Sequence, residues 1–301
     1  MADGHSVTTT TAVAARSCFV SAPDGLRLHV REWGSRLWEA TPVLCLPGLA
    51  RTADDFDALA AALAGGAAGA PRRVLAMDYR GRGLSDYAAD WRDYDLKVEN
   101  ADILACCTAL GLAHAVVVGT SRGGLHAMML AATRPALLRG VVLNDIGPVL
   151  EARGLARIRG YVGKLPQPAS WPDAEDLLKR TMGAQFPALD AAGWAAYARL
   201  TFKEEKGRLE PRYDVRLMKG LEALDLESPL PSAWPQFDGL ADAPLLVLRG
   251  ERSDLLSPET LADMVRRHPR AESHVVEGQG HAPLLLDPPT IARVAAFVRP
   301  L

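Results

Sequence analysis

The chain has 301 residues, of which 49% are hydrophobic and 23% charged, and a formal net charge of −2. These proportions are those of an ordinary folded protein, so they exclude disordered, collagen-like and coiled-coil chains. The 34 Lys and Arg residues nearly balance the 36 Asp and Glu residues. That balance argues against a nucleic-acid partner, because nucleic-acid-binding proteins usually carry a basic excess.

The amino terminus and the cysteines indicate a cytoplasmic protein. Residues 1–16 are polar and rich in threonine, without the apolar run of a signal peptide, and no run of roughly 18 apolar residues predicts a membrane span. The four cysteines are Cys18, Cys45, Cys106 and Cys107. Their spacing is not that of a zinc site, so we expect free thiols in a reducing compartment. We predict a flexible tail over residues 1–15 and no membrane partner.

The predicted elements follow one another as in a parallel sheet wrapped by helices. Short apolar or β-branched runs recur, each followed by a turn and a helical pattern. The predicted strands are 18–21, 26–33, 43–46, 73–78, 115–119, 141–144, 245–249 and 273–276. The first two are joined by a Pro-Asp-Gly turn, and the second alternates apolar with polar residues, as in an antiparallel hairpin. The later strands are continuous apolar runs, so we predict an α/β protein with a mostly parallel central sheet and helices on both faces.

A long insertion interrupts this pattern. About 100 residues separate the strand ending at Asn144 from the strand beginning at Leu245, several times the usual length of a connection. Helical spacing is found at 152–164, 173–185 and 190–204 within it, and a last helix is predicted at 289–299. We therefore predict a helical cap over 147–243, inserted into a core made of 16–146 and 244–301.

The sharpest local signal is a G-x-S-x-G motif that runs from Gly119 to Gly123. It lies between an apolar strand and a helix predicted over 125–133, which is the context of a serine nucleophile on a tight strand-to-helix turn. The alternatives are a Gly-rich turn of no function and a phosphate cradle. Neither phosphate-binding glycine fingerprint is present. The motif therefore predicts that Ser121 is a nucleophile.

A serine nucleophile needs a base and a carboxylate that orients the base. His281 lies in a Gly-rich loop after the last predicted strand, and we expect it to be the base. Asp254 follows the strand 245–249, at the sheet edge where sites of open α/β sheets lie. We rank Asp254 first for the acid and Asp145 second, since Asp145 has an alternative structural role at the entry to the cap. Glu251 ranks third.

Ester chemistry also needs two donors aimed at the developing oxyanion. One is expected to be the backbone N–H of Arg122, the residue after the nucleophile. The other is expected from Leu49, in the loop after the third strand, where Gly48 permits a close backbone approach.

These motifs resemble those of the α/β-hydrolase fold superfamily with a helical cap, over nearly the whole chain from Cys18 to Leu301. The order Ser121, Asp254, His281 is the order of that superfamily, and the stretch 78–86 resembles its segment after the fourth strand. Many members carry His-Gly where this chain has Pro-Gly before Leu49, so Leu49 is assigned by position. The resemblance argues against haloalkane dehalogenases and epoxide hydrolases, because those relatives place Asp where Ser121 stands.

The predicted function is that of a serine carboxylic ester hydrolase acting through an acyl-enzyme. The expected partner is a small-molecule ester with a small to medium acyl group, a lactone or a polyester, and no metal or organic cofactor is implied. The cap aromatics Tyr161 and Trp194 are expected to line an apolar pocket. The sequence does not indicate an oligomeric state.

Two alternatives remain open at this stage. A carbon-carbon bond hydrolase of ring-cleavage products resembles this chain in fold, but it would need cations for a second substrate carboxylate. The candidate cations are Arg153, Arg157, Arg159 and Lys164. The other alternative is a non-catalytic ligand-binding protein of the same fold.

Overall fold

The structure is a computed structural model that describes residues 13–228 and 230–301. Most of the predicted tail, residues 1–12, lies outside the described residues. The first strand begins at Arg16.

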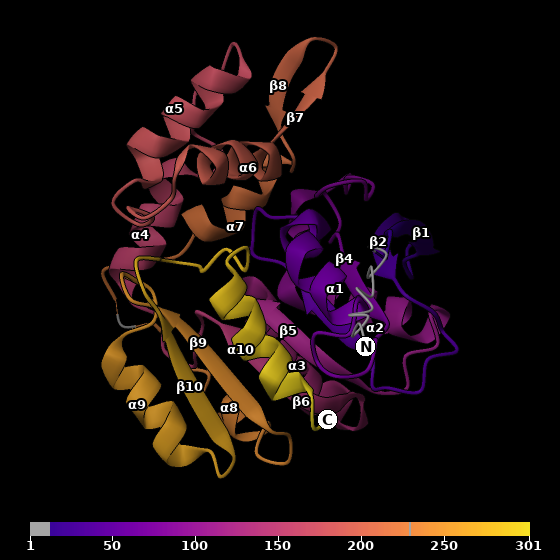
Figure 1. Cartoon of the computed structure of the whole chain (residues 1–301). Coiled ribbons are helices and arrows are strands. Elements are labelled where there is room, and N and C mark those ends of the chain that lie inside the picture. The colour runs from indigo at the N-terminus through magenta and orange to yellow at the C-terminus, as the bar shows by residue number, and fades with distance from the viewer. Residues whose placement is uncertain (1–12, 229) are drawn as a thin grey trace, which may run out of the picture.

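One sheet forms the centre of the described chain (Figure 1). Its strands, in spatial order, are β1 (Arg16–Ser21), β2 (Arg27–Trp33), β4 (Val74–Met77), β3 (Val43–Leu46), β5 (Ala115–Thr120), β6 (Leu138–Asn144), β9 (Leu245–Gly250) and β10 (Ala271–Val276). β2 is antiparallel to both of its neighbours, and every other adjacent pair is parallel. The prediction of a mostly parallel sheet with an antiparallel start is confirmed.

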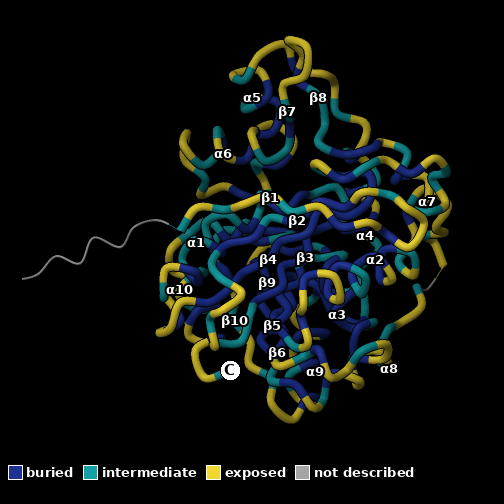
Figure 2. Tube along the Cα trace, turned by 90° about the vertical axis from the view of Figure 1, so that its right-hand side faces the viewer, coloured by how far each residue is buried: buried dark blue, intermediate teal, exposed yellow. Residues whose placement is uncertain are grey.

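The central strands are buried because helices cover both faces of the sheet (Figure 2). Residues that alternate along a strand point to opposite faces, so a continuous apolar run supplies two cores at once. Val117 of β5 packs into one cluster and Val118 into the other. The first cluster is covered by α2 (Leu96–Ala109), α3 (Arg122–Thr133), α8 (Trp234–Asp238) and α9 (Pro258–Arg267). The second is covered by α1 (Asp57–Ala64) and α10 (Pro288–Val298).

The insertion between β6 and β9 places most of its elements above one end of the sheet (Figure 1). These elements, which we call the cap, are α4 (Ala152–Tyr161), α5 (Trp171–Met182), α6 (Ala191–Thr201), β7 (Phe202–Glu205), β8 (Arg208–Pro211) and α7 (Met218–Glu222). α5 and α6 enclose a small apolar core of their own. The last helix of the insertion, α8, does not pack in the cap. It packs into the first cluster on the sheet, which also contains residues of α3.

The hairpin β7–β8 corrects one prediction. We expected a helix over 190–204, but α6 ends at Thr201 and the chain turns into an antiparallel strand. Lys206 and Gly207 form the turn with φ angles of 52° and 74°. Two successive positive φ angles are typical of the tight hairpin turns that match strand twist, so the turn residues override the helical spacing before them.

Within the described residues, no helix is long and apolar enough to cross a membrane. All four cysteines are free, and Cys45, Cys106 and Cys107 are buried. Burial raises the pKa of each of these three thiols. They therefore behave as small apolar core residues rather than as reactive thiolates.

Candidate active site

Ser121 occupies a sharp turn between β5 and α3. Its backbone dihedrals are φ 51° and ψ −113°, a conformation that favours glycine, as at the first central position of a type II′ turn. The turn is possible because its neighbours lack side chains. A Cβ atom at Gly119 would overlap the carbonyl of Gly123, and one at Gly123 would overlap the carbonyl of Leu46.

This crowding predicts a stability effect at Gly123. Gly123→Ala is expected to lower the free energy of unfolding by about 3 kcal/mol, because the new methyl group meets backbone that cannot move aside. Gly160→Ala is the matched control, since a Cβ atom at Gly160 in α4 meets nothing within 4 Å. The control is expected to leave the melting temperature unchanged or raise it slightly. Equal melting temperatures of the two variants would contradict this account of the turn.

Ser121, His281 and Asp145 form a hydrogen-bonded series. The Nε2 atom of His281 lies 2.9 Å from the Oγ atom of Ser121, and its Nδ1 atom lies 2.8 Å from the Oδ2 atom of Asp145. A carboxylate only accepts, so Nδ1–H donates to Asp145 and Nε2 is left to accept the Ser121 hydroxyl proton. This is the arrangement in which a serine hydroxyl is activated by a base whose tautomer a carboxylate fixes.

Asp145 is held rigidly at the end of β6. Its side chain is fully buried, and its Oδ1 atom accepts the backbone N–H of Gly250 at 2.8 Å. Its Oδ2 atom accepts the hydroxyl of Ser253 at 2.7 Å in addition to the His281 ring. Three donors therefore satisfy the carboxylate and fix the direction in which it faces His281.

The first-ranked acid, Asp254, is not the partner of His281 in this structure. Its carboxylate binds Arg157 of α4 at two points, Nε to Oδ2 at 2.5 Å and Nη2 to Oδ1 at 2.8 Å. Although burial opposes ionisation, this guanidinium holds the pKa of Asp254 below its ordinary value. The third-ranked Glu251 is exposed and accepts the backbone N–H of Gly278. The prediction that Asp254 orients His281 is therefore wrong in its geometry.

Two side chains near His281 were missed by the sequence reasoning. Ser253 lies in the loop already singled out for Asp254, and its position beside that residue was the available signal. Gln185 of the cap accepts the backbone N–H of His281 through Oε1 at 3.0 Å. It follows α5 in a segment without a motif, and nothing in the sequence indicates that it reaches the core.

The two expected oxyanion donors flank Ser121. Gly48, beside Leu49, lies close to the turn at Ser121, because a Cβ atom at Gly48 would be 3.8 Å from the Cβ atom of Ser121. Arg122 begins α3, and the first N–H groups of a helix have no intrahelical acceptor. Within residues 13–228 and 230–301, no hydrogen bond engages the backbone N–H of Leu49 or of Arg122. Both groups are therefore free to bind an anionic oxygen.

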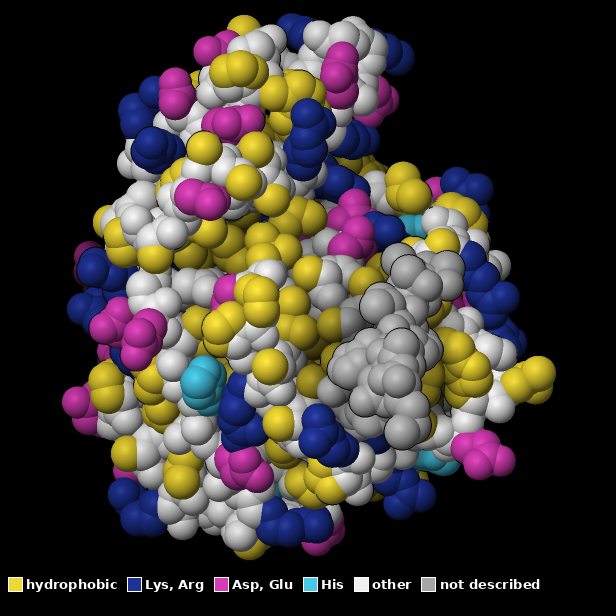
Figure 3. Space-filling model, in the orientation of Figure 1, with side chains coloured by type: hydrophobic (Ala, Val, Ile, Leu, Met, Phe, Trp, Pro, Cys, Tyr) yellow, Lys and Arg dark blue, Asp and Glu magenta, His cyan; other side chains and the backbone are white. Residues whose placement is uncertain are grey.

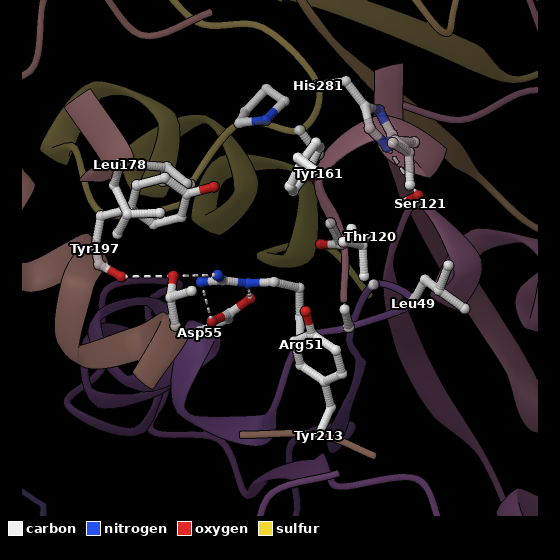
Figure 4. A pocket seen from close by; sticks show the side chains of 18 of the residues that line it. Leu49, Arg51, Asp55, Thr120, Ser121, Tyr161, Leu178, Tyr197, Tyr213 and His281 are labelled. Carbon is white, nitrogen blue, oxygen red and sulfur yellow. Dashed lines mark hydrogen bonds and ion pairs between the residues drawn. The ribbon is translucent and has the colours of Figure 1, made fainter. Parts of the chain in front are cut away.

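A pocket opens from Ser121 between the core and the cap (Figure 4). Its wall combines the loop at Leu49 with cap side chains that include Tyr161, Leu178, Tyr197 and Tyr213. Figure 3 shows hydrophobic side chains gathered where the cap meets the core. Tyr161 thus lines the pocket as predicted. Trp194 does not: it packs against Tyr197, 6.1 Å between ring centroids, inside the apolar core of the cap.

One ion pair lies in the pocket wall. Arg51 binds both oxygens of Asp55, through Nε and Nη2, each at 2.7 Å, and its Nη1 donates to Thr201 Oγ1 at 3.0 Å. The guanidinium also lies over the Tyr197 ring, 5.0 Å from its centroid. Because Asp55 neutralises Arg51, the pair adds polarity to the pocket without net charge. Figure 4 shows the pair facing the same space as Ser121 and Tyr161.

Comparison with known proteins agrees with this fold. The model of the family described as alpha/beta hydrolase fold matches residues 41–288. A 3-hydroxybutyrate-oligomer hydrolase of Cupriavidus necator is 33% identical, over 92% of this chain and 94% of its own. A 2-(acetamidomethylene)succinate hydrolase of Mesorhizobium japonicum is 29% identical, over 69% of this chain and 71% of its own.

A solved structure extends the similarity to the whole fold. The crystal structure of an alpha/beta hydrolase from Novosphingobium aromaticivorans has a TM-score of 0.88 and 39% sequence identity, and the match covers 97% of this chain and 100% of that one. Relatives of this kind are hydrolases. The chain therefore belongs to the alpha/beta hydrolase fold family, and it is a hydrolase by this relationship.

Proposed function

We propose that this hydrolase cleaves neutral carboxylic esters through a covalent acyl-enzyme on Ser121. The observation that carries the proposal is the series Ser121, His281 and Asp145 at the floor of a pocket. A hydroxyl that donates to a neutral imidazole 2.9 Å away can lose its proton as it attacks a carbonyl carbon.

In the proposed reaction, Ser121 Oγ forms a bond to the ester carbonyl carbon while its proton passes to His281 Nε2. Asp145 stabilises the resulting imidazolium through the Nδ1–H hydrogen bond. The tetrahedral intermediate then expels the alcohol, which takes the proton from Nε2. A water molecule, deprotonated by His281, then attacks the acyl-enzyme. The bond between the acyl carbon and Ser121 Oγ breaks, the proton on His281 Nε2 returns to Oγ, and the acid is released.

The negative oxygen of each tetrahedral intermediate is assigned to the backbone N–H groups of Leu49 and Arg122. Both donors lie beside Ser121, and both lack a protein acceptor among the described residues. Preorganised donors of this kind stabilise charge that develops only in the transition state, by several kcal/mol in comparable sites.

Charge in the pocket wall favours an ester that carries no charge near the reacting carbonyl. Of the cations considered for a second substrate carboxylate, Arg157 is paired with Asp254, and Arg153 is exposed. Arg159 donates to the Leu224 carbonyl, and Lys164 lies half exposed, 4.0 Å from Glu222. Arg51, which does line the pocket, is neutralised by Asp55. None of the four considered cations lines the pocket, and Arg51 is already paired, so these residues offer no free cation to a dicarboxylate inside it.

Within neutral esters, we assign the chain to short acyl esters and to oligomers of hydroxy acids. The relative from Cupriavidus necator is a 3-hydroxybutyrate-oligomer hydrolase, and such oligomers are joined by uncharged ester bonds. Leu49, Tyr161, Leu178 and Tyr197 give the pocket an apolar wall with hydroxyl groups, which suits a chain of alternating methyl groups and ester carbonyls.

This assignment predicts the order of activity on a panel of substrates. The wild-type protein is expected to hydrolyse p-nitrophenyl butyrate and the methyl ester of a 3-hydroxybutyrate dimer at least about 100-fold faster, in kcat/KM, than an acetamidomethylene succinate or a ring-fission dienoate. The reason is that both of these substrates would bring carboxylate charge to a pocket wall in which the Arg51 cation is already paired, at a cost of several kcal/mol. The measurement is kcat/KM at equal protein concentration, with release of free acid followed by titration.

The panel separates the alternatives. A preference for the dienoate would support the carbon-carbon bond hydrolase instead. If the protein turns over none of the substrates and a fluorophosphonate does not label Ser121, the proposal of a catalytic serine is contradicted. A ligand-binding protein of this fold is then favoured.

A further inference from the structure

The two loops that carry the proposed oxyanion donors are joined beneath the site by one carboxylate. Glu99 of α2 is fully buried. Its Oε2 atom accepts Arg122 Nε–H at 2.6 Å, and its Oε1 atom accepts Arg82 Nη1–H at 2.7 Å. The Arg122 side chain is also fixed by a hydrogen bond to the Tyr94 carbonyl at 2.9 Å. The residue that follows the nucleophile is therefore anchored through its side chain.

Arg82 extends the connection to the other donor loop. Its side chain is completely buried, and its Nε–H donates to the Leu49 carbonyl at 2.9 Å. Tyr79, over whose ring the Arg82 guanidinium lies, donates its hydroxyl to the Pro47 carbonyl at 3.2 Å. The two bonded carbonyls lie on either side of the peptide that carries the Leu49 N–H. Because peptide units are planar and rigid, fixing both neighbours restricts the direction of that N–H.

The charge state of this cluster is well defined. Although burial opposes ionisation, the guanidiniums of Arg82 and Arg122 hold the pKa of Glu99 below its ordinary range. Burial lowers the pKa of His126, so its neutral ring donates Nε2–H to Glu99 Oε2 at 3.1 Å. Glu99 thus binds three donors as a carboxylate, in a region without solvent where such bonds are strong.

We propose that Glu99 is a positioning residue that sets the separation of the two oxyanion donors, holding Arg122 directly and Leu49 through Arg82. The inference rests on the proposed function, because it concerns the transition state of that reaction. Within the described part of the chain, Glu99 does not line the pocket and makes no hydrogen bond to Ser121. Its proposed effect on the reaction is therefore through the geometry of the donors.

The test is Glu99→Gln compared with Asp102→Asn. Gln keeps the shape of Glu99 but turns one acceptor into a donor, so one of the two guanidiniums loses its partner. Asp102 is a matched control, because it lies on the same helix and is buried in a two-point pair with Arg80 of the same loop, at 2.7 Å and 2.8 Å. Among the described residues, neither side chain of that pair makes a hydrogen bond to Leu49 or Arg122.

Four quantities are measured for each variant: the melting temperature, kcat and KM for p-nitrophenyl butyrate, and the second-order rate constant for labelling of Ser121 by a fluorophosphonate. Labelling forms an Oγ–P bond, releases fluoride and passes the serine proton to His281. Negative charge develops on the phosphoryl oxygen in the transition state, where it would use the same two donors. Both variants are expected to lose thermal stability. Only Glu99→Gln is expected to lower kcat and the labelling rate, by about 10 to 100-fold, with KM within about threefold.

Equal kcat and equal labelling rates in Glu99→Gln and Asp102→Asn would show that Glu99 is only structural, and they would overturn the inference. If Glu99→Gln does not fold, Arg122→Met tests the same link, since its side chain is 14% exposed and its loss leaves the backbone N–H in place. That variant is then expected to show the same loss of kcat.

The wild-type protein separates this inference from the proposed function. If it is labelled by the fluorophosphonate but hydrolyses no ester, the proposed function is contradicted, and the labelling rates of the variants still test Glu99. A wild type that does neither contradicts both.

Discussion

Replacing Asp145 by Asn is expected to lower kcat for ester hydrolysis by about 10⁴-fold. The amide offers an N–H group where His281 Nδ1–H needs an acceptor, so the imidazole is driven to the tautomer that carries its proton on Nε2. That tautomer cannot accept the proton of Ser121. The amide also cannot stabilise the imidazolium that forms in the transition state. The measurement is kcat on p-nitrophenyl butyrate for folded variant and wild type.

Asp254→Asn is the control for this prediction. Both carboxylates follow a strand at the same edge of the sheet, but Asp254 is bonded to Arg157 and not to His281. Its substitution removes a partly exposed ion pair between core and cap and is expected to change kcat by less than about fivefold. A large loss in Asp254→Asn together with a small loss in Asp145→Asn would restore Asp254 as the acid.

Substitution of Ser121 is expected to abolish hydrolysis, and the choice of substituent separates chemistry from strain. Ser121→Ala and Ser121→Gly both remove the nucleophile, so each is expected to lower kcat by about 10⁵-fold or more. Ser121→Gly is also expected to unfold at a higher temperature than Ser121→Ala. The reason is that the dihedrals of this residue, φ 51° and ψ −113°, cost a residue with a Cβ atom about 1–3 kcal/mol and glycine much less.

Thermal unfolding of the three proteins tests the strain. Equal melting temperatures of Ser121→Ala and Ser121→Gly would mean that the turn stores no conformational energy. Retained hydrolysis in either variant would show that another group performs the attack. Loss of activity with a raised melting temperature in Ser121→Gly would mean that the nucleophile is held in place at the expense of stability.

The fold and two of the three site residues could be predicted from the sequence because their signals are local. An apolar run of four to eight residues bounded by turns favours a buried strand, and the glycines around Ser121 are required by the turn itself. His281 was predictable because only one histidine follows the last strand in a Gly-rich loop. In each case the information lies within about ten residues of chain.

The acid could not be chosen in this way because the choice depends on distances between segments. Asp145 follows β6, which lies directly beside β5 and its Ser121. Gly250 ends β9 and Ser253 lies in the loop that follows. The backbone N–H of Gly250 and the hydroxyl of Ser253 donate to Asp145. Asp254 comes one residue later and faces the cap instead. Only packing decides which of two similar loops faces the histidine, and the sequence order of the three residues is the same for either choice.

The roles of Glu99 and Gln185 were inaccessible for the same reason. Glu99 lies in a helix with no motif, and its partners Arg82 and Arg122 come from two other segments. Gln185 reaches His281 across 96 positions of sequence. Buried charges of this kind are evident only when their surroundings are known, because an isolated glutamate in a helix is usually solvent-exposed.

The wide spacing of the triad along the chain has a consequence for biosynthesis. Ser121 and His281 are separated by 160 positions, and β10, which precedes the histidine loop, must pair with β9 before that loop is placed. Chains are synthesised from the amino terminus, and a domain generally folds as a unit. The segment that carries the nucleophile is therefore synthesised well before the segment that carries its base. Until His281 is in place, Ser121 lacks the base that the proposed mechanism requires, so hydrolysis is expected to depend on the pairing of β10 with β9.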